Sequence, residues 1–362
     1  MLGPRGSGKT VFLSSMYNKL STQGKLGFFL KVEGTEKRKR LNKIYTKVAF
    51  EEEWPMGTQM AEVSEWEFTC CVQTKDLSIY DACKFLYIDY SGNKITEITG
   101  EEDHEFDDKI KASDMMLVLL DGEKVSHLMR QEKPGNIWAY TELPNLLQEV
   151  QKIQNKPVHF VISKWDLVEP HYTLEEIRDR LLEIEQFDNI VRTRKEKQRI
   201  RLIPLSSVGK GFATPLPDGK MVKNIGVLPK PFQVEVPLAC ILPDIIEMKL
   251  RELNRKIEAK EVKPELGFRE RLGQFTGAIG GGVRSIQELL PEKYQFGENI
   301  LENFIESAKK PAREKKAEAL NKVIDETTAL GSVVNSFLSI KEQLDDIFPE
   351  SDFTGVLDDL EE

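Results

Sequence analysis

Short apolar runs recur along the first two hundred residues and predict buried β-strands. They cover residues 85–88, 115–120, 158–162 and 201–205, and residues 66–74 alternate like an antiparallel partner of the first run. Helical spacing appears between them at residues 143–154 and 173–187, where Thr173 and Glu176 form a capping-box signature. Strands and helices that alternate at these lengths predict a three-layer α/β fold, with a mostly parallel sheet and helices on both faces.

A glycine-rich loop stands at the start of the chain and is followed by helical spacing. It consists of Gly3, Pro4, Arg5, Gly6, Ser7, Gly8, Lys9 and Thr10. Such a loop turns backbone N–H groups toward the α- and β-phosphates of a nucleotide, while the lysine reaches the β- and γ-phosphates and the threonine faces Mg²⁺. The alternative is a glycine-rich turn that binds nothing. A buried strand should precede the loop, so we expect the recorded start to lie inside a longer chain and the loop to be poorly anchored.

A second candidate motif follows the run at residues 85–88. Asp89 ends this run and Gly92 comes three residues later. A carboxylate at the end of a buried strand can hold the waters of a phosphate-bound Mg²⁺, and the glycine N–H can bond the γ-phosphate. An ordinary turn after a strand gives the same pattern, so the motif has weight only together with the phosphate loop.

The next two strand runs end in residues that suit a guanine base. Ser163, Lys164 and Asp166 follow residues 158–162, and the Asp166 carboxylate can accept the N1–H and N2–H₂ donors that guanine has and adenine lacks. The aliphatic stem of Lys164 can lie over the base plane. The last run delivers three residues whose backbone N–H groups can meet the guanine O6: Ser206, Ser207 and Val208.

These four motifs, in this order, resemble those of the Ras-like, TRAFAC-type P-loop GTPases. The run from Trp54 to Thr58 is similar to the switch of bacterial double-GTPase-type proteins. The resemblance implies that GTP or GDP binds with Mg²⁺, that Thr58 closes over Mg²⁺ and the γ-phosphate, and that Thr35 is the alternative. The family's base-reading motif normally begins with Asn or Thr, and here it begins with Ser163. That change weakens the contact expected between the side chain at position 163 and the phosphate loop.

The resemblance also bears on catalysis, in which Lys9 and Thr58 would take part. Ras-type enzymes orient water with a glutamine after the Asp-x-x-Gly motif, and Asn93 occupies that position here. Asparagine is shorter, so we expect slow hydrolysis of GTP, or hydrolysis that depends on a partner. Arg5 either stabilises charge in cis or faces solvent or a partner. A nucleotide-dependent scaffold without turnover and a P-loop ATPase are the alternatives.

The chain divides, on this interpretation, into a GTPase domain at residues 1–253 and a helical extension at residues 254–362. We interpret the glycines at residues 276–283 as a hinge or tight turn. Apolar positions in the extension, or the switches, are the expected contacts for an unidentified protein partner.

Composition narrows the function classes further. The 362 residues carry a net charge of −9, concentrated in the extension, which argues against binding to nucleic acid or anionic membranes. The four cysteines lack metal-ligand spacing, so we expect reduced thiols in the cytoplasm. No apolar run is long enough to be a transmembrane segment.

Overall fold

The computed structural model describes residues 1–55, 64–89, 104–216, 220–258, 323–324 and 326–354. The elements of the first half are α1 (Lys9–Leu20), β1 (Phe29–Val32), α2 (Thr35–Phe50), β2 (Ser64–Gln73), β3 (Ile79–Asp89), α4 (His104–Ala112), β4 (Met116–Asp121), α5 (Gly122–Met129), α6 (Lys133–Ile137), the π-helix Trp138–Glu142 and α7 (Leu143–Gln151). Those of the second half are β5 (Val158–Ser163), the 3₁₀ turn Trp165–Leu167, α8 (Leu174–Leu182), α9 (Glu185–Arg194), β6 (Ile200–Pro204), β7 (Ala213–Pro215), β8 (Met221–Lys223), α10 (Val236–Ala239), α11 (Ile241–Glu258), α16 (Glu326–Ile347) and the 3₁₀ turn Pro349–Ser351.

Two three-stranded sheets organise an α/β fold. Strands β4, β5 and β6 are parallel, whereas β1, β2 and β3 are antiparallel, and β7 pairs with β8 in a separate hairpin. The predicted antiparallel partner of residues 85–88 is confirmed as β2. One mostly parallel sheet was predicted, and that is only partly right. The reason is the tight turn between β2 and β3, in which the Thr74 N–H donates to the Ser78 carbonyl at 2.9 Å. A turn this short makes the two long strands that it joins run in opposite directions.

Met1 and Leu2 lie between the two sheets. The Leu2 N–H donates to the Leu117 carbonyl at 2.7 Å, and the Leu119 N–H donates to the Leu2 carbonyl at 2.8 Å, so Leu2 pairs in parallel with β4. On the other side, the Met1 amino group donates to the Ile88 carbonyl of β3 at 2.8 Å. These bonds fix the base of the glycine-rich loop, for which the sequence predicted poor anchoring.

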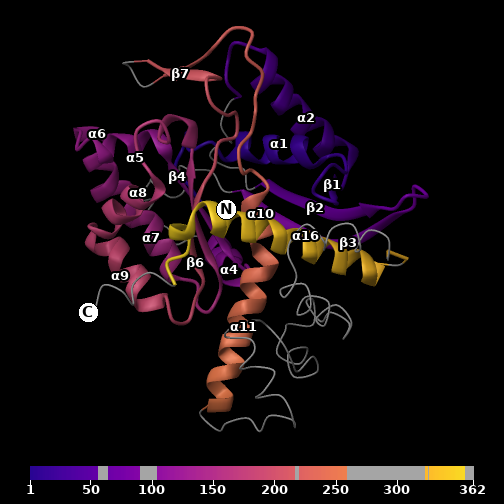
Figure 1. Cartoon of the computed structure of the whole chain (residues 1–362). Helices are drawn as coiled ribbons and strands as arrows, with labels where there is room; N and C mark the ends of the chain where they lie inside the picture. The colour runs from indigo at the N-terminus through magenta and orange to yellow at the C-terminus, as the bar shows by residue number, and fades with distance from the viewer. Residues whose placement is uncertain (56–63, 90–103, 217–219, 259–322, 325, 355–362) are drawn as a thin grey trace.

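Helices cover both faces of this arrangement. Every residue of β4 and β5 is buried, as expected for parallel strands with helices above and below. Helices α5 to α9 pack on one face (Figure 1), and α1, α10, α11 and α16 share the core of the other. Helix α16 contacts β3 and β2, with the Phe337 ring 5.2 Å from that of Phe28 and 6.0 Å from that of Phe85.

A largely buried ionic cluster joins β5, β6, α11 and α16. Asp244 accepts from His159 Nε2 at 2.7 Å and from Arg201 Nε at 2.7 Å, and Arg201 also reaches Asp345 at 2.7 Å. His159, Arg201 and Asp244 are all fully buried. Burial alone would raise the pKa of Asp244, but the adjacent Arg201 and His159 outweigh it and hold that pKa well below its usual range. The cluster therefore depends on an ionised Asp244.

The segment after α16 closes the edge of the parallel sheet. The Phe353 N–H donates to the Ile200 carbonyl at 3.1 Å, and the Phe353 side chain is fully buried beside Phe187. Asp352 pairs with Arg199 at 2.7 Å. Residues near the end of the chain thus complete the core formed by the first two hundred.

Two further predictions are confirmed by the fold. The Thr173 capping box is formed, and all four cysteines are free thiols. Residues 276–283 lie outside the described residues. Over the part of the chain that the structure describes, no helix combines the length and the apolar character needed to cross a bilayer.

Candidate functional site

The glycine-rich loop leads directly into the N-terminus of α1. Gly8 has a φ of 86°, a left-handed conformation that glycine adopts without strain and that starts the helix at the next residue. At Gly3 the constraint is space, because a Cβ there would lie 2.7 Å from Ser7 Oγ and 3.1 Å from Leu119 Cβ. The loop therefore presents its backbone at the positive end of a helix, which is an arrangement suited to anions.

Lys9 is the buried cation of this loop. Its ammonium donates to the carbonyl of Gly3 at 2.5 Å and to that of Pro4 at 3.2 Å, so it folds over the loop itself. Burial lowers the pKa of Lys9, and the nearby Asp89 carboxylate opposes that shift. A desolvated ammonium that donates to two neutral carbonyls gains much from an incoming phosphate.

The Asp89 carboxylate lies near this cation. Asp89 ends β3 and is 2% exposed, and Thr10 follows Lys9 as the second residue of α1. A carboxylate and a hydroxyl are hard donors of the kind that Mg²⁺ prefers when phosphates supply its other ligands. Gly92, Asn93 and Thr58 lie outside the described residues. Thr35, the alternative to Thr58, begins α2.

Asp166 and Ser206 meet at the ends of β5 and β6. The Ser206 hydroxyl donates to Asp166 Oδ1, and it accepts from the Gly209 N–H at 2.7 Å. Burial raises the pKa of Asp166, while the Ser206 hydrogen bond opposes the rise. The carboxylate is thus partly desolvated, and a ligand that brings two N–H donors would compensate for the lost water.

The remaining residues assigned to the base make contacts that the sequence did not predict. The Lys164 ammonium lies 2.9 Å from the Asp121 carboxylate and 3.3 Å from that of Glu123. Burial alone would lower the pKa of Lys164, but these two carboxylates outweigh it and raise that pKa. The Ser163 hydroxyl donates to the Leu120 carbonyl at 3.1 Å, so it ties β5 to β4.

The backbone after β6 is largely engaged within the protein. The Ser206 N–H donates to the Phe232 carbonyl at 3.1 Å, and the Val208 N–H lies 3.4 Å from Ser206 Oγ. Ser207 lies between them and is partly exposed. The predicted contact with the guanine O6 therefore depends most on the Ser207 N–H.

A lysine that sequence reasoning missed anchors the loop before Thr58. The Lys223 ammonium contacts three carbonyls at the end of α2 and beyond, those of Lys47, Glu51 and Glu53, at 2.8, 2.7 and 2.9 Å. It also lies 4.8 Å from the centre of the Trp54 ring, whose Nε1 donates to the Met221 carbonyl at 2.7 Å. In the sequence, Trp54 and Pro55 before a candidate switch drew attention to this loop. Nothing in the sequence indicated that Lys223 contacts it.

Arg5 completes the list of predicted residues. Its side chain is exposed at the tip of the glycine-rich loop.

Comparisons of the chain with models of protein families, with curated proteins and with solved structures found no match. The function must therefore be inferred from the residues of the site.

Proposed function

We propose that this chain binds GTP with Mg²⁺, hydrolyses it slowly, and controls a protein contact through the nucleotide that is bound. One observation carries the proposal: the phosphate loop with Lys9, the carboxylate of Asp89 and the carboxylate of Asp166 lie along one edge of the sheets. That edge is formed by the carboxyl ends of the strands, where α/β proteins bind their ligands.

The phosphate half of the site would bind the charged end of the nucleotide. The N-terminus of α1 and the loop N–H groups would hold the α- and β-phosphates, and Lys9 would leave the Gly3 and Pro4 carbonyls for the β- and γ-phosphates. Thr10 and Asp89 are the residues that would hold Mg²⁺ and its waters, and the ion would neutralise charge on the phosphates. Thr58 and Asn93 remain our candidates for closing the site and orienting water.

The base half of the site would select guanine over adenine. Asp166 would accept the N1–H and N2–H₂ donors, and the Ser206 hydroxyl already orients its carboxylate. Asp121 and Glu123 hold the Lys164 ammonium, which keeps the aliphatic stem of that lysine beside the turn. A desolvated carboxylate at this position would not favour ATP, since adenine offers no matching pair of hydrogen-bond donors.

The experiment is a nucleotide titration of the purified chain with Mg²⁺, using fluorescent GTP, ATP and XTP, with wild type and Asp166→Asn. We expect GTP to bind at least 100-fold more tightly than ATP. Asp166→Asn should lose GTP affinity and gain XTP affinity, because the amide donates where xanthine has a carbonyl. The matched control is Asp346→Asn, an exposed residue on α16. Unchanged GTP affinity in Asp166→Asn would refute the assignment.

Turnover needs a separate measurement. Single-turnover release of phosphate from GTP, followed for hours with and without Mg²⁺, should give a slow Mg²⁺-dependent rate. Tight GTP binding with no phosphate release would instead identify a nucleotide-dependent scaffold and would overturn the enzymatic part of the proposal.

A further inference from the structure

Three of the four thiols lie on β2 and β3, where these two strands pair. Cys70 is directly opposite Cys83 in the antiparallel register. The register shifts at the next residue, so that Cys71 is opposite Asp81. A shift of this kind is a β-bulge, and it gives the two adjacent cysteines different partners on β3.

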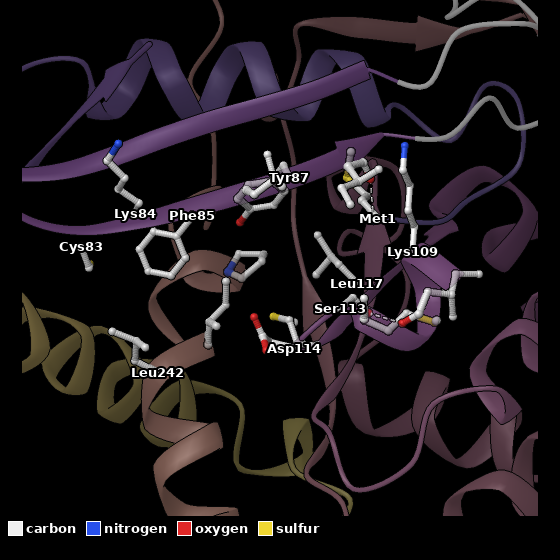
Figure 2. A pocket seen from close by; sticks show the side chains of 18 of the residues that line it. Met1, Cys83, Lys84, Phe85, Tyr87, Lys109, Ser113, Asp114, Leu117 and Leu242 are labelled. Atoms are coloured by element: carbon white, nitrogen blue, oxygen red, sulfur yellow. Dashed lines mark hydrogen bonds between the residues drawn. The ribbon is translucent and has the colours of Figure 1, made fainter. Parts of the chain in front are cut away.

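The thiols of Cys70 and Cys83 face each other. Directly opposite residues of an antiparallel pair have Cα atoms about 4.5 to 5.5 Å apart, and disulfides span Cα distances of about 4.4 to 6.8 Å. The two thiols are already hydrogen-bonded to each other. Figure 2 shows the Cys83 side chain on the same side of β3 as that of Phe85, which belongs to the buried core. The contact between the thiols follows from the pairing of β2 with β3 alone.

Cys71 is engaged by other groups. Its thiol donates to Asp81 Oδ1 at 3.2 Å, and the Lys31 ammonium donates to the same carboxylate oxygen at 3.0 Å. Burial and the hydrogen bond to Asp81 raise the pKa of Cys71 to about 12, so it stays a protonated thiol and a poor nucleophile. Burial also raises the pKa of the fourth thiol, Cys240, to about 12. Geometry and charge thus single out one pair.

We propose that Cys70 and Cys83 form a dithiol that hydroperoxides oxidise reversibly to a disulfide. In the first step the Cys83 thiolate attacks the peroxide, the O–O bond breaks, and Cys83 becomes a sulfenic acid. The departing hydroxide or alkoxide takes a proton from solvent. In the second step the Cys70 sulfur attacks the Cys83 sulfur. The S–S bond forms as the S–O bond breaks, and the thiol proton of Cys70 leaves with the hydroxide as water. The two sulfurs lose the two electrons that the peroxide gains.

The order of the two steps follows from the surroundings of each thiol. Cys70 is fully buried, and burial together with the Cys83 thiol raises the pKa of Cys70 well above its usual range. A buried, protonated sulfur reacts poorly with a dissolved peroxide, whereas Cys83 is the less buried of the two. Cys70 suits the second step, because it is hydrogen-bonded to the Cys83 sulfur and carries the proton that the departing hydroxide needs.

The test counts free thiols in the whole chain. Purified protein is treated with hydrogen peroxide, unfolded, labelled with N-ethylmaleimide and weighed by intact-mass spectrometry. The reduced chain carries four labels, one for each cysteine. The oxidised chain should carry two, and treatment with dithiothreitol before labelling should restore all four.

Three alanine variants identify the pair, since Cys70 and Cys71 are adjacent and stay together in proteolytic peptides. Cys71→Ala is the matched control and should form the disulfide at about the wild-type rate. Cys70→Ala and Cys83→Ala should form none. Cys70→Ala leaves a sulfenic acid at Cys83 without a thiol to resolve it, so dimedone should label Cys83 roughly 10-fold more in this variant than in wild type.

Four labels on peroxide-treated wild type would overturn the proposal, and so would a loss of labels that dithiothreitol does not restore. A disulfide that persists in Cys83→Ala, or one that disappears in Cys71→Ala, would also overturn it. Circular dichroism checks that each variant folds. If Cys70→Ala does not, the comparison of Cys83→Ala with Cys71→Ala decides. The reaction needs no nucleotide, so its outcome is independent of the GTP titration.

Discussion

The Ser206 hydroxyl donates a hydrogen bond to Oδ1 of Asp166 and so joins the turns that follow β6 and β5. The two residues are forty positions apart, and their contact follows from the parallel pairing of Ile162 with Pro204 at the strand ends. Ser206 also accepts from the Gly209 N–H. A single hydroxyl thus orients the carboxylate to which we assign guanine recognition.

Ser206→Ala should weaken GTP binding without unfolding the protein. Loss of one hydrogen bond to a charged group costs about 1.5 kcal/mol, which corresponds to roughly 10-fold in affinity. The measurement is a fluorescent-GTP titration, with Ser207→Ala as the matched control, since its backbone N–H is kept. Equal affinities of wild type and Ser206→Ala would show that Asp166 does not depend on this bond.

Lys9→Met should separate ligand binding from stability. The ammonium is buried against carbonyl groups, and burial lowers its pKa, so replacing it with an apolar side chain of similar length should leave the melting temperature of the free protein unchanged or raised. At a GTP concentration 100 times the Kd, the free energy of unfolding of wild type should rise by about 2.7 kcal/mol, and that of the variant should hardly change. Scanning calorimetry with and without Mg²⁺-GTP measures both. A variant that GTP still stabilises fully would contradict the role of Lys9.

Asp244→Asn should destabilise the fold, because it leaves Arg201 and His159 buried without their shared anion. Removing one partner of a buried ion pair costs about 3 to 5 kcal/mol. The folded-state pKa of Asp244 is depressed. The stability that the ionised Asp244 contributes is therefore fully present above its unfolded-state pKa, near 4, and is lost progressively as pH falls below that value.

Urea unfolding between pH 3 and pH 7 tests this dependence. Wild type should lose stability below about pH 4, and Asp244→Asn should show a flatter profile in that window. Asp346→Asn, on the exposed side of α16, serves as the control and should follow wild type. Parallel profiles for wild type and Asp244→Asn would assign the acid sensitivity to other carboxylates.

Lys223→Met should release the loop that precedes Thr58. The variant keeps an apolar stem beside Trp54 but removes the cation that contacts the Lys47, Glu51 and Glu53 carbonyls. We expect a loss of about 2 kcal/mol in the free energy of unfolding, measured in urea, and a smaller GTP-over-GDP preference. Lys25→Met, at an exposed position, should change neither. A variant as stable as wild type would show that these contacts are too solvated to matter.

Local features of this fold were predictable from sequence. The Thr173 capping box is set by residues three apart, and the ends of β4, β5 and β6 meet because parallel strands share a carboxyl edge. Asp166 and Ser206 could therefore be assigned to one place before any coordinates. Whether they recognise guanine remains a prediction.

Contacts between distant segments were not predictable. The packing of Phe337 on Phe28 joins residues more than three hundred positions apart, and apolar spacing in α16 indicated a buried face without its partner. The ion pairs of Lys164 with Asp121 and Glu123 were missed for a related reason, since a lysine in a base-reading motif was assumed to serve only the base. Which distant residues contact each other depends on their proximity in three dimensions, and the periodicity of apolar residues does not encode that proximity.

The burial of Phe353 beside Phe187 has a consequence for the order of events during synthesis. A ribosome that has completed β6 has made the whole parallel sheet, yet Ile200 still lacks the N–H of Phe353 and Arg199 still lacks Asp352. About 150 further residues must be added, at roughly 5 to 20 per second, before this edge can close. For many seconds the nascent chain exposes an apolar surface that a chaperone could bind, so the last native contacts form only after residue 353 leaves the exit tunnel.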